Sequence, residues 1–199
     1  MRSGHSQMHR ADWALVVLFL ATFEYAVQGQ TGSKSHAASP ACADTTQRLL
    51  APFVGHWTVR VAYRRGEAAW DSSTGEAHIR SEMDGCLLRE DLHGARFGAP
   101  YHYLALWGAH GMPPRPIQRT FAHSQHGILS LSEGNWNARA DTLILEDSAY
   151  VRDTWVRQRV VLSRPGPAGF TREGWRSEDH GQTWIVTERA RYAPRRVQR

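Results

Sequence analysis

The sequence predicts an all-β fold: an antiparallel, up-and-down β-barrel of eight to ten short strands with one short N-terminal helix. Three observations lead to this prediction. From residue 56 onward, apolar and polar residues alternate with a period of two in one segment after another. Turn residues, drawn from 17 Gly and 9 Pro among others, separate these segments. The 199-residue chain also holds 8 Trp, 6 Tyr and 6 Phe, enough large side chains to fill the core of one domain.

The elements are expected in a simple order along the chain. A short helix covers residues 45–51, because Asp and Thr residues can cap its start and Pro52 limits its length. Residues 56–65 form the most regular strand, and the Gly134-Asn135 pair is expected to close a later strand in a turn. Closing the sheet removes edge strands that would pair with other chains. The remaining strands are expected over residues 74–83, 86–93, 99–107, 117–123, 128–133, 142–146, 154–163, 169–177 and 183–192.

Residues 1–29 have the composition of a secretory signal peptide. Basic side chains open the segment, an apolar stretch follows, and small residues precede the expected cleavage after Gly29. The apolar stretch is short for a bilayer span, and an uncleaved anchor stays an open alternative. Residues 30–41 are small and polar and predict a flexible linker. We therefore expect a periplasmic or secreted protein whose barrel domain covers residues 42–193.

The chain has two cysteines, Cys42 and Cys86. In an oxidising compartment an even pair predicts a disulfide. Closing a loop of this length contributes roughly 4 kcal/mol of stability in the chain-entropy model. The alternative is two unpaired buried thiols. We expect the disulfide because the N-terminal segment predicts export.

The formal net charge of +5 comes almost entirely from arginine, since Lys34 is the single lysine. Arginines gather near the C-terminus, where residues 194–199 form a basic tail. A basic cluster can bind nucleic acid, but a solvated last strand with a basic tail is the commoner structure. An exported protein also meets anionic lipid or glycan before it meets nucleic acid. We expect no nucleic-acid partner and a weak contact with the cell-envelope surface.

Residues 177–184 match the Asp-box pattern S-x-D-x-G-x-T-W. The pattern occurs in sialidase-like propellers and also outside them. A propeller needs several copies and a longer chain, whereas one copy is present here. We expect a structural hairpin in which the Asp179 side chain accepts hydrogen bonds from turn amides, Gly181 takes a positive φ and Trp184 folds under the turn.

Phe53, Gly55 and Trp57 follow the short helix as Phe-x-Gly-x-Trp. This arrangement resembles the opening motif of the calycins, the lipocalin-like barrels, in which the Trp packs across the closed end. The further residues that carry the resemblance are the run Asp84 to Glu90, Trp107, Gln118, Phe121, Gly134, Trp136 and the Asp-box hairpin. Together they resemble an exported bacterial family of calycin-like barrels, of the lipocalin and nitrobindin type, with no assigned function. The resemblance implies a barrel with an internal cavity and implies no substrate.

The alternation predicts an interior lined mainly by aromatic side chains, with Glu90, Glu188 and Arg119 among them. A buried carboxylate is costly unless it is paired, and Arg119 is its natural partner. An apolar pocket with a few polar groups is typical of a small-ligand site. The expected ligand-binding residues are Trp57, Tyr63, Glu90, Tyr101, Tyr103, Trp107, Arg119 and Glu188. The other side chains expected to point inward are Val59, Val61, Leu88, Phe121, Trp184 and Tyr192. The alternatives are a purely structural ion pair between the acids and Arg119, or a position of these groups at a hydrated barrel mouth.

The histidines give no clear metal or cofactor site. His123 and His126 are close in sequence but lie at an expected hairpin turn, without further ligands nearby, so we expect no metal. Nitrobindin-type barrels, which the chain resembles in strand count, bind haem through a single His. No position here matches that His; His78, His102 and His110 are candidates only because they are present. We expect no cofactor, and haem stays a minor alternative.

The chain carries no G-x-S-x-G, H-E-x-x-H or phosphate-cradling glycine loop. Glu90 and Glu188 would serve as a glycosidase pair only at a suitable separation. We therefore expect a binding protein before an enzyme, holding a small apolar or amphipathic ligand inside the barrel with Glu90, Glu188 and Arg119 at its polar head. The alternative is a structural or interaction protein of the cell envelope, with a filled barrel and a basic C-terminal contact surface.

Overall fold

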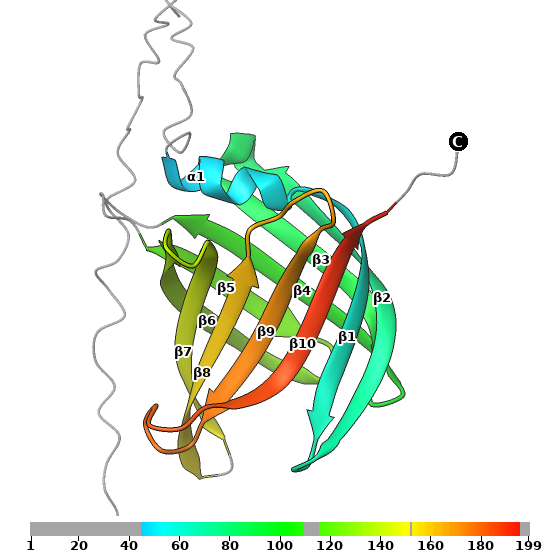
Figure 1. Ribbon diagram of the computed structural model, residues 1–199, viewed down its shortest axis with the longest axis vertical. Helices are drawn as coiled ribbons and strands as arrows, with labels where there is room; N and C mark the ends of the chain where they lie inside the picture. The colour runs from blue at the N-terminus through cyan, green and yellow to red at the C-terminus, as the bar shows by residue number, and fades with distance from the viewer. Residues whose placement is uncertain (1–44, 110–115, 152, 196–199) are drawn as a thin grey trace, which may run out of the picture. The chain divides into compact units, whose positions relative to one another are not determined.

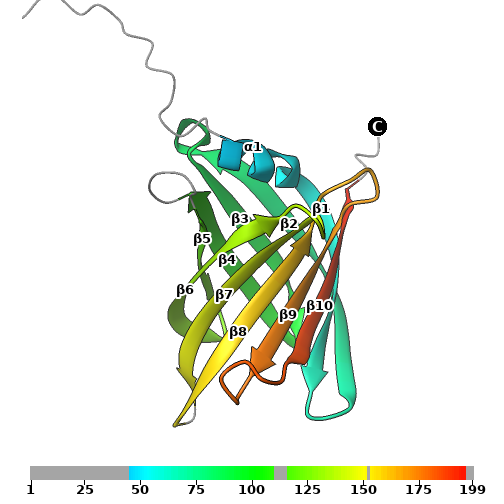
Figure 2. The same ribbon diagram turned by 60° about the vertical axis from the view of Figure 1, so that its left-hand side comes forward.

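The computed structural model describes residues 45–109, 116–151 and 153–195, in which ten antiparallel strands close into a barrel (Figure 1). Each strand pairs with its neighbours in sequence, and β1 also pairs with β10 to close the ring. This confirms the predicted all-β, up-and-down barrel. The strands are β1 (Gly55–Arg65), β2 (Ala69–Glu82), β3 (Leu87–Arg96), β4 (Ala99–Ala109), β5 (Ile117–His123), β6 (His126–Asn137), β7 (Thr142–Val151), β8 (Thr154–Ser163), β9 (Phe170–Ser177) and β10 (Ile185–Pro194). Figure 2 shows β6 to β10 running side by side, tilted across the barrel wall.

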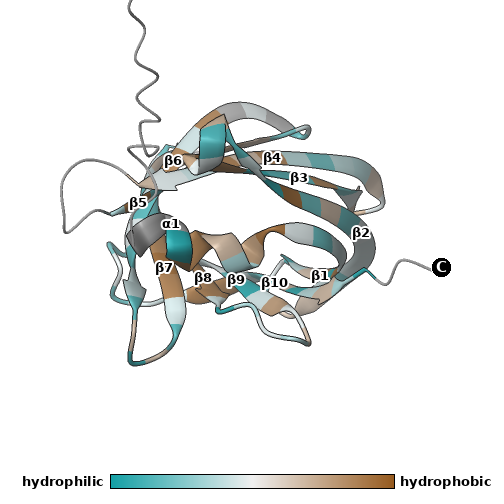
Figure 3. Cartoon of the chain, turned by 90° about the horizontal axis from the view of Figure 1, so that it is seen from above, coloured by the Kyte–Doolittle hydropathy of each residue, from teal (hydrophilic) through white to brown (hydrophobic). Residues whose placement is uncertain are grey.

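Two short helical segments precede β1 and lie at one end of the barrel. They are α1 (Thr45–Leu50) and the 3-10 turn η1 (Ala51–Phe53), close to the predicted helix. Figure 3 shows α1 at that end of the ring of strands, seen from above. Leu50 and Phe53 are fully buried, so the segment closes the end of the barrel with apolar side chains.

Aromatic rings fill the interior beneath this helical segment. The Phe53 ring centroid lies 5.6 Å from that of Trp107 and 5.0 Å from that of Phe170. The Trp57 indole N–H donates to the Phe53 carbonyl oxygen at 3.0 Å, which ties β1 to the helical turn. Phe170 also stacks on Tyr192 at 4.2 Å. Trp57 therefore packs at the closed end, as the calycin resemblance implies.

Several strands are longer than the alternation predicted, because tight hairpins let pairing continue close to the turn. β2 begins at Ala69 and β7 continues to Val151. The turn expected at Asp84-Gly85 is present as the 3-10 turn η2 (Met83–Gly85), where Asp84 takes a φ of 55°.

The turn predicted at Gly134-Asn135 is wrong, because β6 runs through it. Gly134 pairs with β5 on one side and β7 on the other. A Cβ added at Gly134 would lie 1.8 Å from the carbonyl oxygen of Ile144. The glycine thus permits a close approach of two backbones in mid-strand, a role that differs from a turn.

The Asp-box segment forms the hairpin that the motif predicts. Asp179 accepts hydrogen bonds from the backbone N–H and the hydroxyl of Thr183, at 2.9 and 2.6 Å, and from the Ser177 hydroxyl at 2.7 Å. These hydrogen bonds, from the Thr183 hydroxyl above all, hold the pKa of Asp179 well below its ordinary value. Gly181 has a φ of 95°, and the Trp184 indole N–H donates to its carbonyl oxygen. The motif fixes the β9–β10 hairpin.

The prediction that Trp184 points into the barrel is wrong. The register between β10 and β9 shifts between Val186 and Glu188, which places a bulge at Thr187. A bulge inverts which face the residues before it occupy. Trp184 accordingly lies on the outer face, where the guanidinium carbon of Arg159 stands 4.0 Å from its ring centroid.

Several sequence predictions fall on residues outside the described ranges. These are the signal peptide, the linker, Cys42, His110 and residues 196–199. The Cys42–Cys86 disulfide therefore stays a prediction. No helix among the described residues is both long and apolar enough to cross a membrane. β10 runs to Pro194, and the Arg195 side chain pairs with Glu76 at 2.7 Å.

Replacing Gly134 tests the close approach of β6 and β7. Gly134→Ala is expected to lower the free energy of unfolding by about 1–3 kcal/mol, because the added methyl forces the backbones apart. Gly127→Ala is the matched control in the same strand, since no described atom lies within 4 Å of its added Cβ. Urea unfolding followed by tryptophan fluorescence measures both variants. An equal, small effect of the two substitutions would contradict this account of Gly134.

A candidate ligand-binding site inside the barrel

The two halves of the barrel interior differ in character. The half beside α1 is filled by apolar and aromatic side chains. The other half, toward the hairpins that join β3 to β4 and β9 to β10, contains a cavity of about 150 Å³. The side chains that line it include Arg96, Tyr101, Tyr103, Arg119, Arg172 and Glu188. The side chain of Glu188 keeps 21% exposure, so this end of the interior reaches solvent.

Arg172 of β9 is the centre of a buried ion network. Its side chain is 5% exposed, and its Nε and Nη2 lie 2.8 and 2.7 Å from one carboxylate oxygen of Glu188. Its Nη1 lies 3.4 Å from Oε1 of Glu90, which is 1% exposed. The Tyr192 hydroxyl donates to the same Glu90 oxygen at 2.8 Å. Two carboxylates and a tyrosine thus surround a single guanidinium.

The protonation states of this network follow from burial and pairing. Burial opposes the charge on Arg172, but attraction to Glu188, Tyr192 and Glu90 raises its pKa well above the ordinary value. Burial also raises the pKa of Tyr192 well above its ordinary value, which keeps the hydroxyl neutral and able to donate. The sequence predicted a structural ion pair as one alternative and named Arg119 as the cation. The ion pair is present, but its cation is Arg172.

Arg119 of β5 is buried without such a partner. It is 3% exposed, and no carboxylate among the described residues lies within ion-pair distance of it. Its buried Nε has no hydrogen-bond partner in the described part of the chain. Its guanidinium carbon stands 4.7 Å from the ring centroid of Phe121 and 6.0 Å from that of Trp107. Aromatic faces attract a cation but do not replace a counter-ion.

The positive charge of Arg119 acts on the carboxyl group of Asp147 of β7. Burial raises the pKa of Asp147 to about 6, and the attraction of Arg119 offsets only part of this effect. Its Oδ1 has no hydrogen-bond partner among the described residues. Asp147 is therefore a separated and easily protonated neighbour that makes no direct ion pair with Arg119.

Arg96, at the end of β3, adds a third cation to the same half of the barrel. Its guanidinium carbon stands 4.9 Å from the ring centroid of Tyr63 and 5.7 Å from that of Tyr101. Burial raises the pKa of Tyr101 to about 12, so its hydroxyl stays protonated at neutral pH. The cavity thus combines cationic groups, neutral hydroxyls and aromatic faces.

The predicted site residues divide into two sets of four. Those that line the cavity are Tyr101, Tyr103, Arg119 and Glu188. Those that are buried elsewhere in the interior are Trp57, Tyr63, Glu90 and Trp107. Sequence reasoning missed Arg172 and Arg96. The alternation of Phe170, Arg172 and Gly174 along β9 gives Arg172 the inward parity that could have identified it.

His78 and His102, the two described histidines among those proposed for haem, do not reach this cavity. His78 stacks on His56 and His102 on His93, and all four lie on the outer faces of β1 to β4. A cavity of about 150 Å³ suits a ligand of the size of benzene, whereas pockets for larger ligands and cofactors occupy roughly 300–1,000 Å³. Among the described residues His123 does line the cavity, but a cavity of this volume is too small for haem.

No metal centre emerges from the described residues either. Within them, no group of three or more His, Cys, Asp or Glu side chains is arranged to hold a metal ion. The side chain of His126, half of the only close His pair in the sequence of the domain, lies outside the described side chains. The polar side chains that line the cavity come from arginine, tyrosine and Glu188, together with His123, Gln158 and Thr187.

Removing the charge of Glu90 tests the buried network. Glu90→Gln keeps an acceptor for Tyr192 but weakens the pairing of a buried guanidinium, so the free energy of unfolding is expected to fall by about 2–3 kcal/mol. Glu82→Gln removes one of the two acidic partners of the partly exposed Arg80 and is expected to cost under about 1 kcal/mol. Denaturant unfolding compares the two variants. Equal costs would contradict a special role for the buried pair.

The raised pKa of Asp147 predicts a stability that depends on pH. The pKa is about 6 in the folded protein and about 4 in an unfolded chain, so stability falls as pH rises from 4 to 6. Asp147→Asn is expected to stabilise the protein at pH 7.5 by an amount on the order of 1–2 kcal/mol, and by much less at pH 4.5. Urea midpoints at the two pH values measure this. The same stabilisation at both would contradict the raised pKa.

Comparison with known proteins supports the fold. No protein-family model matches the chain, and no curated protein matches it. The expected membership of an exported calycin-like family therefore stays a prediction. Among solved structures, the crystal structure of Rv2717c from M. tuberculosis matches with a TM-score of 0.54 and 15% identity, over 77% of this chain and 99% of that chain. At this identity the likeness is one of fold: the chain is similar to Rv2717c in its barrel architecture.

Proposed function

We propose that this protein binds a small organic anion inside the barrel, with the anionic group at Arg119 and an apolar or aromatic body against the cavity wall. The observation that carries the proposal is the buried Arg119 guanidinium beside a cavity of about 150 Å³, without a carboxylate partner among the described residues. A planar guanidinium binds a carboxylate or phosphate through two parallel hydrogen bonds.

The energetics support an anionic rather than a neutral ligand. A buried charge without a partner costs several kcal/mol, and this cost is offset when a counter-ion arrives. Glu90 and Glu188 already pair with Arg172, so neither is available to neutralise Arg119. The sequence predicts that Glu90, Glu188 and Arg119 together contact the polar head of the ligand. We now propose that this head is an anion and that Arg119 alone binds it.

The lining suits a compact ligand. Tyr103 has a buried hydroxyl without a partner among the described residues, and it packs at 5.8 Å from the Phe121 ring. Such a hydroxyl can donate to a second ligand atom, while the two rings supply apolar contact. The volume favours an acid with about ten non-hydrogen atoms or fewer.

We also propose, from the sequence, that the protein acts outside the cytoplasm. The N-terminal segment supports cleavage near Gly29, and the Cys42–Cys86 pair supports a disulfide in that compartment. The oxidised chain would be two hydrogens lighter than the reduced chain. Intact mass before and after reduction measures that difference, and an unchanged mass would contradict the disulfide.

Calorimetric titration with benzoate, acetate and inorganic phosphate tests the binding proposal. Benzoate is expected to bind, and Arg119→Met is expected to weaken it at least tenfold because a charged hydrogen bond is lost. The variant should unfold at no lower urea concentration than the parent, since it removes an unpaired buried charge. Arg80→Met removes the same charge from the outer face and serves as the matched control.

A neutral analogue completes the test. Benzyl alcohol has the same ring without the charge, and it is expected to bind at least tenfold more weakly than benzoate. Absence of binding by all three anions to the parent protein would contradict the proposal. Benzoate binding that survives Arg119→Met would contradict the assignment of the anion to Arg119.

A further inference from the structure

A second cluster of arginines lies on the outside of the barrel, over β1, β2, β9 and β10. It lines a groove of about 630 Å³ on the outer face. Arg60 of β1 lies directly opposite Arg191 of β10 in the strand register, and Arg189 follows two residues along β10. All three side chains are exposed. We call this surface the outer arginine face.

Two like charges directly opposite each other on one face of a sheet destabilise it. Arg60 and Arg191 nevertheless form no ion pair with any described carboxylate. Arg80 and Arg89 also face each other across β2 and β3. There, however, Asp91 lies 3.6 Å from Arg80 and 2.9 Å from Arg89. Among the described residues, one cross-strand arginine pair is thus compensated by a carboxylate and the other is not.

The groove supplies the other groups that an oxyanion needs. The hydroxyls of Ser72, Thr74 and Thr171 line it beside the arginines. Ala62, opposite both Ser72 and Arg189 in the register, leaves space at the floor. The groove also holds one acid, Glu173, whose carboxylate lies 3.7 Å from Arg189. Guanidinium and hydroxyl donors around a hollow are the groups that bind phosphate oxygens.

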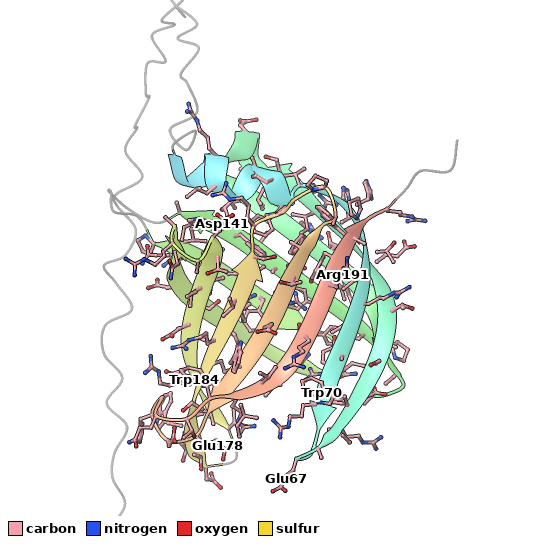
Figure 4. All side chains as sticks on the ribbon, in the orientation of Figure 1. Glu67, Trp70, Asp141, Glu178, Trp184 and Arg191 are labelled. Carbon is pink, nitrogen blue, oxygen red and sulfur yellow. The ribbon has the colours of Figure 1, made fainter. Side chains whose placement is uncertain are left out.

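An exposed tryptophan borders the same surface. Trp70 of β2 is 38% exposed, and the guanidinium carbon of Arg189 stands 5.2 Å from its ring centroid. Figure 4 shows Trp70 and Arg191 on the side of the barrel that faces the viewer. Tryptophan is enriched where proteins meet the interface between a membrane and water. The combination favours a lipid headgroup layer over a single dissolved ion.

We propose that the outer arginine face docks on an anionic lipid surface, with Arg60, Arg189 and Arg191 contacting headgroup phosphates and Trp70 entering the interfacial layer. The arginines are spread over β1 and β10, with roughly 7 Å between successive residues of one face of a strand. This spread matches an array of phosphates. The contact predicted from sequence for the C-terminal tail stays a prediction. The proposed docking uses the barrel wall and is independent of the ligand inside.

Sedimentation of the full chain with lipid vesicles tests this proposal. The parent is expected to bind phosphatidylglycerol vesicles more tightly than phosphatidylcholine vesicles at about 0.1 M salt. The double variant Arg60→Gln, Arg191→Gln is expected to lose about 25-fold in binding to the anionic vesicles, or about fivefold for each arginine. The double variant Arg80→Gln, Arg89→Gln changes the net charge equally on a compensated pair and is expected to lose far less.

Three results would overturn the proposal. The first is equal loss of binding in the two double variants, with urea midpoints showing that both are folded. The second is equal binding of the parent to anionic and neutral vesicles, which would assign membrane contact to apolar residues alone. The third is complete release of the parent by 10 mM inorganic phosphate but not by sodium chloride of equal ionic strength. That release would identify a site for a single ion in place of a membrane-docking face.

Discussion

The barrel depends on one buried ion network, that of Arg172 with Glu90 and Glu188. Arg172 comes from β9 and Glu90 from β3, which lie almost opposite each other in the ring of ten strands, so the contact crosses the interior. A slip of one residue in either strand would turn one charge outward and leave its partner buried and unpaired. Such a charge costs several kcal/mol, so the network selects one register as well as holding the two walls together.

The network uses both inward glutamates, Glu90 and Glu188. Arg119, which also points inward, is therefore left without a carboxylate partner among the described residues. Burial raises the pKa of Asp147, an acid that the charge of Arg119 influences, to about 6. Arg119 is buried against Phe121 and Trp107. A fold optimised for stability alone would replace such a group with an apolar residue of similar size. Local rules of stability are typically violated where a protein has a function to perform. Arg172 is therefore explained by the fold, whereas the burial of Arg119 is what the proposed ligand accounts for.

The fold and part of the candidate site could be predicted from the sequence. The predictions that were wrong have physical causes. Alternation in residues 56–65 identified a strand and its inward face, because hydrophobic burial acts locally on each residue. Gly134 was mistaken for a turn, since its need for glycine comes from Ile144 on a neighbouring strand. Trp184 was assigned inward because a bulge at Thr187 has no signature in composition. The pairing of Glu90 with Arg172 joins residues 82 positions apart, and parity alone could not choose between two inward arginines.

The surroundings of an unpaired arginine determine what it can recognise. Inside the barrel, water is largely excluded, so one guanidinium interacts strongly with one anion and the cavity wall limits that anion in size. On the outer arginine face, solvent and salt weaken each contact, and a useful affinity requires several arginines acting on several phosphates at once. Arg119 thus suits selection of a single small molecule, whereas Arg60 and Arg191 suit adhesion to a charged surface. Arg119, Arg60 and Arg191 share a residue type and have no carboxylate partner among the described residues. The dielectric environment differs between the two places, so the interior favours one strong contact and the outer face favours the sum of several weak ones.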